Sequence, residues 1–377
     1  MARSDAYDLR FFESSENVRR VIADALGREP NAAVSKDVAV SIQQGRMFFE
    51  SAADAPIEIR PLLLYYGMMA FAKSVVSGRG LRPLSALTQK HGLRDVSPHA
   101  ARLAALTVKI EGNGTFHDFN DVICHQEGIN YFENAMSRRH MLRMAPSAQL
   151  VGIQITLKDT LARIPGLQDL FQATFGEKAD VLPFNLHAYA GPAESVDLRI
   201  DVPDLFEDRN SLRRIVEGIR AKYATLQRWR FSSAEKPWDN SVIIFQNVAP
   251  IAHELAPENL VEEFDGRRIK IRPIEPQTHI DFRQLLDPVA GRLTQPYPSL
   301  VVPIAGAHIS DISLQYVGMF LLSSLVRYRP QTWVHSVSRF ASQERPADDQ
   351  ALALIERFMN AAQGTFPNLV TRLLTQP

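Results

Sequence analysis

The chain has 377 residues, of which 45% are hydrophobic and 22% are charged, as is typical of a folded globular protein. Basic and acidic residues number 42 each, so the overall charge gives no argument for a nucleic-acid or membrane partner, although a local basic patch stays open. The single cysteine, Cys124, excludes an internal disulfide and a multi-cysteine metal site. Without an apolar run of signal-peptide or bilayer-spanning length, we expect a cytoplasmic protein that makes no membrane contact.

The first 80 residues predict three helices. Apolar residues recur at helical spacing in segments 14–26 and 35–51, which predicts two amphipathic helices. Segment 56–80 carries no charge between Pro61 and Ala72, and its apolar residues cover every face of a helix. It therefore predicts a central helix that is buried all round.

The middle of the chain predicts strands. Alternation around Gly112-Asn113-Gly114 predicts a β-hairpin, and residues 127–145 then predict a polar, Arg-rich helix. Residues 156–171 predict helix on both sides of Pro165. From residue 181 to 303 the composition is typical of strands, with one helix near 209–225. The runs that predict strands are VDLRIDV, SVIIFQNV, RRIKIRPI and SLVVPIA.

A second strongly apolar helix is predicted over 311–328, capped by Ser310 or Asp311 and ended by Pro330. Further helices are predicted over 347–362 and 365–374. Gly67 and Gly318 both lie in the middle of an apolar helix, where glycine is unfavourable unless it permits a close approach. We therefore expect the two apolar helices to cross with these glycines facing each other.

Together these patterns predict an α+β fold, and the length predicts two structural lobes. Residues 1–105 would form an N-terminal helical part, and residues 106–305 a mixed, β-rich middle region. Residues 306–377 would then supply C-terminal helices that pack back on the N-terminal part.

Three stretches resemble a known family. RPLLLYYGMMAFAKSV with KHGL beyond it, IPGL at 164–167 and MFLLSSLVRYRPQTW at 319–333 resemble the YaaC-like family of bacterial proteins, over most of the chain. Resemblance to that family implies no particular reaction, substrate or catalytic residue. More loosely, residues 35–95 resemble HEPN helical-bundle domains, which occur in RNA-cleaving toxins, in antiviral effectors and in inactive RNA-binding or scaffolding relatives. The resemblance implies a HEPN-like bundle built from the N- and C-terminal helices.

HEPN ribonucleases pair an Arg and a His that are separated by four to six residues, so the resemblance implies a catalytic Arg–His pair. Histidine can transfer a proton near neutral pH, and arginine can hold the scissile phosphate. The candidates are Arg329 with His335, after the late apolar helix, and Arg94 with His99. A third spacing, Arg272 to His279, falls among predicted strands and does not suit a helical site. Because arginine is abundant, the spacing alone does not identify a site.

Other residue groups give weaker alternatives. Arg138, Arg139 and Arg143 could bind RNA backbone, although a solvated helix face is the more common explanation. The histidines and aspartates of segment 117–125 would be scattered over both faces of a hairpin, so we expect no metal site and no cofactor. Cys124 beside His125 lacks the arrangement of a cysteine nucleophile.

The resulting hypothesis is an RNA-associated cytoplasmic protein of stress response or antiviral defence, in its catalytic form a metal-independent HEPN-type endoribonuclease. The first alternative is a non-catalytic scaffold whose helical bundle binds a protein partner or forms a homodimer. A further alternative is a small-molecule enzyme that uses the middle region.

Overall fold

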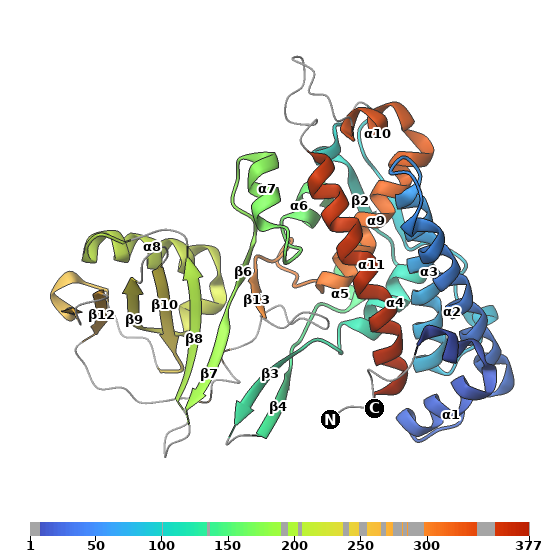
Figure 1. Ribbon diagram of the computed structural model, residues 1–377, viewed down its shortest axis with the longest axis horizontal. Coiled ribbons are helices and arrows are strands. Elements are labelled where there is room, and N and C mark those ends of the chain that lie inside the picture. The colour runs from blue at the N-terminus through green and yellow to red at the C-terminus, as the bar shows by residue number, and fades with distance from the viewer. Residues whose placement is uncertain are drawn as a thin grey trace. The chain divides into compact units, whose positions relative to one another are not determined.

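The structure is a computed structural model that describes residues 8–99, 101–133, 136–189, 195–202, 206–236, 241–248, 255–264, 269–273, 281, 285, 298–337 and 351–376. It is an α+β structure with helices towards both ends of the chain and strands concentrated in the middle (Figure 1). The chain divides into two compact units. The helical unit comprises Met1–His125, Ala145–Ala179 and Ile304–Pro377, and the strand-rich unit comprises Gln126–Met144 and Asp180–Pro303.

The helical unit consists of α-helices and one short sheet. Its helices are α1 (Ser15–Leu26), α2 (Ala32–Ala53), α3 (Arg60–Gly80), α4 (Thr115–Ile123), α5 (Ser147–Leu150), α6 (Leu157–Leu161), α7 (Gln168–Phe175), α9 (Asp311–Tyr328), α10 (Pro330–Ser336) and α11 (Ala351–Thr375). The sheet is antiparallel in the order β1-β2-β5, with β1 (Leu93–Asp95), β2 (Thr107–Ile110) and β5 (Gln154–Thr156). Short 3₁₀ turns occur at Leu9–Glu13, Leu84–Ala86 and Leu103–Ala105.

Helix α3 is the centre of this unit, as its sequence predicts. It contacts α2, α4, α9 and α11 (Figure 1). Leu64 and Tyr65, on adjoining faces, are fully buried, but the face that carries Tyr66 and Lys73 is only half-buried, so α3 is not buried all round as predicted. The left-handed residue that ends it is Leu81 rather than one of the predicted glycines. No helix in the described part of the chain is both long enough and apolar enough to cross a membrane.

Helices α3 and α9 pack together, as predicted, but through aromatic side chains instead of glycines. The Tyr65 ring lies 5.6 Å from the rings of both Tyr316 and Phe320, measured between centroids. The predicted contact between Gly67 and Gly318 is wrong. A Cβ on Gly67 would lie 2.4 Å from the Phe49 ring of α2, and one on Gly318 would lie 2.7 Å from Phe358 of α11. Each glycine permits a close approach, but to a different helix.

Several local predictions in the helical unit are confirmed. Helix α1 is capped by Ser14 and ends at Gly27, and α9 begins where the Ser310 hydroxyl accepts a hydrogen bond from the Ile312 amide. Helices α6 and α7 lie on either side of Pro165. The two predicted C-terminal helices are instead one helix, α11, which contains Pro367.

Two predictions for residues 107–145 are wrong. Residues 107–123 do not form a hairpin, because β2 pairs with β1 and β5, and Gly114 leads into α4 at a φ of 128°. There is no room for a side chain at Gly114, since its Cβ would lie 2.4 Å from the Gly92 nitrogen. Residues 127–145 form the hairpin of β3 (Gly128–Glu133) and β4 (Met136–Met141) instead of a helix.

The strand-rich unit contains a six-stranded sheet in the order β11-β12-β9-β10-β8-β7, in which every neighbouring pair is antiparallel. The four predicted strand runs are confirmed as β8, β10, β12 and β13, and the helix predicted near 209–225 is confirmed as α8. Of the third Arg–His spacing, Arg272 lies on β12, and His279 lies outside the described residues. The elements are β6 (Val181–Pro183), β7 (Asn185–Tyr189), β8 (Ser195–Val202), α8 (Arg209–Lys222), β9 (Arg230–Lys236), β10 (Ser241–Gln246), β11 (Leu260–Phe264), β12 (Ile269–Pro273) and β13 (Ser299–Val301), which pairs with β6, together with the 3₁₀ turns Ala224–Arg228 and Pro257–Asn259.

Candidate functional site

Arg329 joins the end of α9 to the segment that follows β1. Its Nη2 atom donates a hydrogen bond of 3.2 Å to the Ser97 carbonyl and lies 3.7 Å from the Asp95 carboxylate. The same carboxylate accepts hydrogen bonds from the Ser324 hydroxyl on α9, at 2.8 Å, and from the Ser97 amide, at 2.9 Å. Arg329 is therefore part of a polar cross-link between two segments that are distant in sequence.

Asp95 is ionised in this cross-link. Burial by itself would raise the pKa of Asp95, but the hydrogen bonds from Ser97 and Ser324 and the charge of Arg329 outweigh burial and hold the pKa below its ordinary value. The pair thus consists of two opposite charges, each with one-fifth of its side chain exposed.

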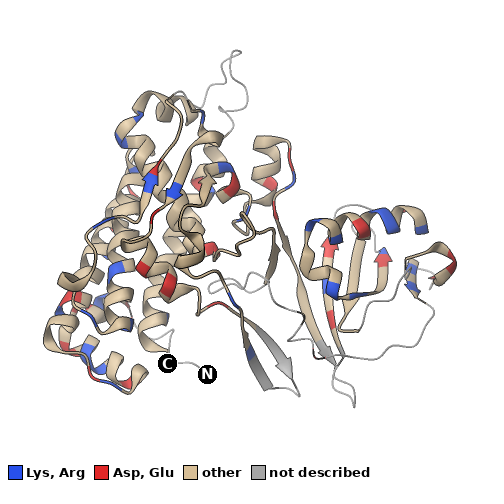
Figure 2. Cartoon of the chain, turned by 180° about the vertical axis from the view of Figure 1, so that it is seen from behind, with Lys and Arg blue, Asp and Glu red and all other residues tan. Residues whose placement is uncertain are grey.

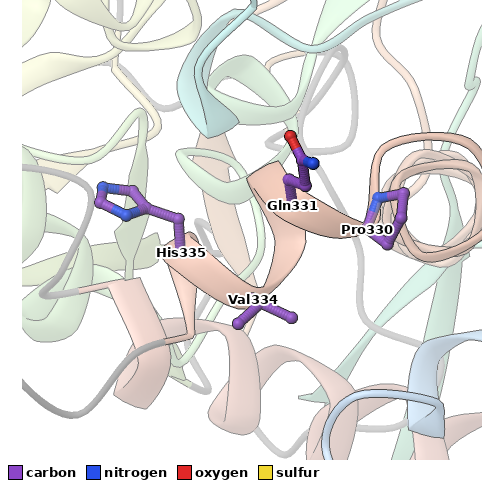
Figure 3. A pocket seen from close by; sticks show the side chains of 4 residues that line it. All are labelled: Pro330, Gln331, Val334 and His335. Carbon is purple, nitrogen blue, oxygen red and sulfur yellow. The ribbon is translucent and has the colours of Figure 1, made fainter.

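His335 lies on α10, the short helix that begins directly after Arg329. It lines a pocket of about 560 Å³ whose described lining residues are Pro330, Gln331, Val334 and His335, all on α10 (Figure 3). The helix is anchored by Trp333, which is 1% exposed and whose indole nitrogen donates a 3.0 Å hydrogen bond to the Glu58 carbonyl. Arg329 is directed to Asp95 and Ser97 and is not among the described lining residues of this pocket.

The other predicted pair, Arg94 and His99, lies on either side of the residues that hold Arg329. Arg94 is exposed on β1 and pairs with Glu111 at 3.0 Å, whereas the adjacent Asp95 contacts Arg329. His99 is exposed in the following loop. The structure brings the Asp95 carboxylate and the Ser97 carbonyl to Arg329, whereas the Arg94 guanidinium pairs with Glu111.

The predicted RNA-binding arginines belong to the strand-rich unit. Arg139 lies on β4, and its Nη2 atom donates a 2.7 Å hydrogen bond to the Gln126 carbonyl. Arg139 is exposed at the surface; partial desolvation lowers its pKa, and the charge of Glu127 opposes this effect. Arg143 is exposed after the strand, and the side chain of Arg138 lies outside the described residues. Arg139 thus helps to hold its own hairpin.

The His and Asp residues of segment 117–125 are not scattered as predicted, because the segment is helical. His117 and Asp121 are one turn apart on α4, and Nδ1 lies 3.6 Å from the carboxylate. Asp121 also accepts a 2.7 Å hydrogen bond from the Ser147 amide. Across the residues that the structure describes, no three His, Cys, Asp or Glu side chains gather as metal ligands would. Cys124 is buried, and burial raises the pKa of its thiol to about 11, which disfavours a nucleophilic thiolate.

A different group of side chains combines positive charge with aromatic rings. We call it the basic aromatic cluster, and it consists of Phe48 on α2, Tyr66 and Lys73 on α3, His91 in the turn before β1, and Arg327 on α9. The Phe48 and Tyr66 rings are stacked with centroids 5.8 Å apart, and the Arg327 guanidinium lies 6.0 Å from the Tyr66 centroid. In the described part of the chain, neither Lys73 nor Arg327 pairs with a carboxylate within 4 Å. Of these two cations, Arg327 thus lies beside the Tyr66 ring, and Lys73 lines the same pocket as the Phe48 and Tyr66 rings.

His91 is held by the neighbouring Tyr65, which is fully buried. The Tyr65 hydroxyl and the His91 Nδ1 atom are 2.8 Å apart. Burial lowers the pKa of His91, and the positive charges of Arg327 and Lys73 lower it further. Burial also raises the pKa of Tyr65, which keeps its hydroxyl protonated. A neutral His91 that accepts the hydrogen bond of the tyrosine hydroxyl on Nδ1 carries its own proton on Nε2, where it can act as a donor.

Comparison with known proteins matches residues 10–374 to one family model, described as YaaC-like Protein. The chain belongs to the YaaC-like family. The match covers nearly the whole sequence, so it includes both units and confirms the resemblance seen in the sequence. Searches of curated proteins and of solved structures found no match to this YaaC-like chain.

Membership of the YaaC-like family assigns no residue a role, so the basic aromatic cluster rests on geometry alone. Tyr66, Lys73 and His91 all lie in the stretches that carry the family resemblance, and their combination of rings and cations was the signal available in the sequence. Arg327 could not be added to them from sequence, because it joins the group only when α9 packs against α3.

Proposed function

We propose that this YaaC-like protein is an RNA-associated cytoplasmic protein of stress response or antiviral defence, and that single-stranded RNA binds at the basic aromatic cluster. The observation that carries the proposal is the pair of uncompensated cations, Lys73 and Arg327, beside the stacked rings of Phe48 and Tyr66. Cations neutralise RNA phosphates, and aromatic rings stack on unpaired bases.

The distribution of charge is consistent with a local site. Both basic and acidic residues occur in each unit (Figure 2), although α8 carries five basic residues and one acidic residue. A chain with 42 basic and 42 acidic residues has no long-range attraction for RNA, so affinity has to come from a few well-placed groups. Cations without carboxylate partners are best suited to bind RNA phosphates, because no existing ion pair has to be broken first.

The test is RNA binding by the full chain, measured by fluorescence anisotropy with a labelled single-stranded oligonucleotide at salt concentrations from about 50 to about 200 mM. We expect Lys73→Ala and Arg327→Ala each to weaken RNA binding. Each should also reduce the slope of log affinity against log salt concentration by about one, as expected for the loss of one phosphate contact. The matched control is Arg28→Ala, which removes an exposed arginine in the turn after α1. Absence of binding by the wild-type chain at low salt would contradict the proposal.

A metal-independent HEPN-type endoribonuclease is the second candidate, with Arg329 and His335 as the catalytic pair. It is favoured by the pocket on α10, which is of small-molecule size and which His335 lines. In this mechanism His335 would transfer the proton and Arg329 would hold the phosphate, so Arg329 would have to exchange Asp95 for the substrate.

RNA cleavage in the presence of EDTA tests this candidate. We expect His335→Ala and Arg329→Ala each to abolish cleavage, and Arg94→Ala and His99→Ala to do so only if the pair near β1 is the catalytic one. Cleavage that survives all four substitutions would exclude both Arg–His pairs, whereas RNA binding without cleavage would leave the binding proposal intact.

A further inference from the structure

The basic aromatic cluster borders a groove between α2 and α3. The groove has a volume of about 480 Å³, within the range of small-ligand sites of about 300–1,000 Å³. Gln44 and Phe48 line it from α2, and Tyr66, Met69 and Lys73 line it from α3, together with Leu62, Leu63 and Ala70. The groove is thus lined mainly by apolar side chains, with one cation, Lys73, and one carboxamide, Gln44.

The shape of the groove follows from two glycines. A Cβ on Gly67 would lie 2.4 Å from Phe49 and 3.2 Å from the Gly45 carbonyl oxygen, and a Cβ on Gly45 would lie 2.5 Å from Phe71. The glycines therefore let the backbones of α2 and α3 approach closely. This approach brings Phe48 beside Tyr66, with their rings inclined by 27°.

We propose that this groove holds one unstacked base of the bound RNA, with the adjoining phosphate held by Lys73 and Arg327. The inference rests on the proposed RNA binding and adds how the RNA is held. Both rings are only half-buried, so a base can stack on them in the offset geometry that aromatic groups prefer.

Charge complementarity favours a base with its phosphate over a purely apolar occupant. Lys73 lines the groove, and Arg327 lies beside Tyr66, so an anionic group is expected next to the rings. The Gln44 side chain is exposed at the groove and makes no hydrogen bond to another described side chain or to the described backbone. Its carboxamide can donate to and accept from the edge of a base, which an apolar ligand would leave unused.

The experiment compares two RNA ligands of equal length, oligouridine and the same ribose–phosphate chain with all bases removed. Both carry the same phosphates, so the difference in affinity measures the contribution of the bases. We expect the wild-type chain to bind oligouridine about tenfold more tightly than the abasic chain. Tyr66→Leu should reduce this preference to less than about twofold with little change for the abasic ligand, whereas Lys73→Ala should weaken both ligands.

Tyr328→Leu is the matched control, because Tyr328 also lies beside Arg327, at 5.0 Å, but is 71% exposed and outside the groove. Gln44→Glu is a second variant at an exposed helix position where folding is not at risk. Its carboxylate beside Lys73 should weaken binding of oligouridine.

The outcomes separate the two proposals. Equal affinity of the wild-type chain for both ligands, or a preference lost in Tyr328→Leu and kept in Tyr66→Leu, would overturn the base-binding inference and leave RNA binding intact. Unchanged binding of oligouridine by Gln44→Glu would also overturn the inference. No binding of either ligand would overturn both proposals.

Discussion

Tyr65 on α3 and His91 in the turn before β1 are joined by a hydrogen bond of 2.8 Å between the tyrosine hydroxyl and the imidazole Nδ1. The contact fixes the turn against the central helix, and the Tyr65 ring at the same time packs against Tyr316 and Phe320 of α9. One side chain therefore links three segments of the helical unit and orients the histidine of the basic aromatic cluster.

Tyr65→Phe should destabilise the protein by about 1–3 kcal/mol, because it leaves the His91 Nδ1 atom without its partner while the ring packing is kept. The free energy of unfolding, measured by urea denaturation, tests this. Tyr328→Phe removes a hydroxyl from a tyrosine that is 71% exposed and should change stability by less than about 0.5 kcal/mol. Equal effects of the two substitutions would show that the hydrogen bond does not contribute.

The pKa of His91 predicts a loss of stability on mild acidification. Since burial and the charges of Arg327 and Lys73 hold the folded-state pKa below that of the unfolded chain, the unfolded state binds the proton first as the pH falls below about 6.5. The contribution of His91 is complete above that pH and declines below it. We expect His91→Gln to reduce the stability lost between about pH 7 and about pH 5.

Burial also lowers the pKa of His308, so His308 likewise makes the protein less stable as the pH falls. His308 is present in both the wild-type chain and His91→Gln, and its effect cancels when the two are compared. If both chains lost the same free energy of unfolding over this pH range, the assignment to His91 would be wrong.

The sequence predicted best where a helix is defined by its own residues. The span of α9, its Ser310 cap and the burial of most of α3 follow from local signals, namely a capping serine, a terminating proline and a run of apolar residues. The strand runs of the middle region were found in the same way, because alternation and β-branched residues are local properties.

Predictions failed where tertiary contacts decide between local alternatives. Gly112-Asn113-Gly114 is a common hairpin turn, but here Gly114 packs against Gly92, and its neighbour Thr115 donates a hydrogen bond to the Lys90 carbonyl, which starts a helix. Pro367 does not end α11, whose buried face continues through Leu369 and Leu373. The partners of Gly67 and Gly318 likewise depend on how three helices are arranged, which neither helix specifies by itself.

The glycine contacts give a direct test of packing between α2 and α3. Gly67→Ala should destabilise the protein by about 1–3 kcal/mol, because the new Cβ would lie 2.4 Å from Phe49 in a closely packed interface. Gly364→Ala is the control, since that helical glycine has no neighbour within 4 Å of its Cβ position. It should stabilise the protein by about 0.5–1 kcal/mol. Stabilisation by both substitutions in urea denaturation would contradict the close approach.

The cross-link around Asp95 predicts that Arg329 stabilises the fold, whether or not it also contacts RNA. Asp95→Ala should cost about 1.5–3 kcal/mol, because it removes the partners of the Ser324 hydroxyl and of the Arg329 charge. Glu111→Ala is the matched control. It breaks the more exposed pair with Arg94 and should cost less than about 1 kcal/mol.

The same cross-link should weaken in acid, with the sign set by the lowered pKa of Asp95. The stabilisation is complete above the pKa of an unfolded aspartate, about 3.9, and is lost as the pH falls through the lower folded-state value, because protonation removes the charge that Arg329 and the two serines contact. Asp95→Asn should therefore be less stable than the wild-type chain at neutral pH, and the difference should narrow below about pH 4. A difference that stays constant down to about pH 3 would show that Asp95 contributes by its shape and not by its charge.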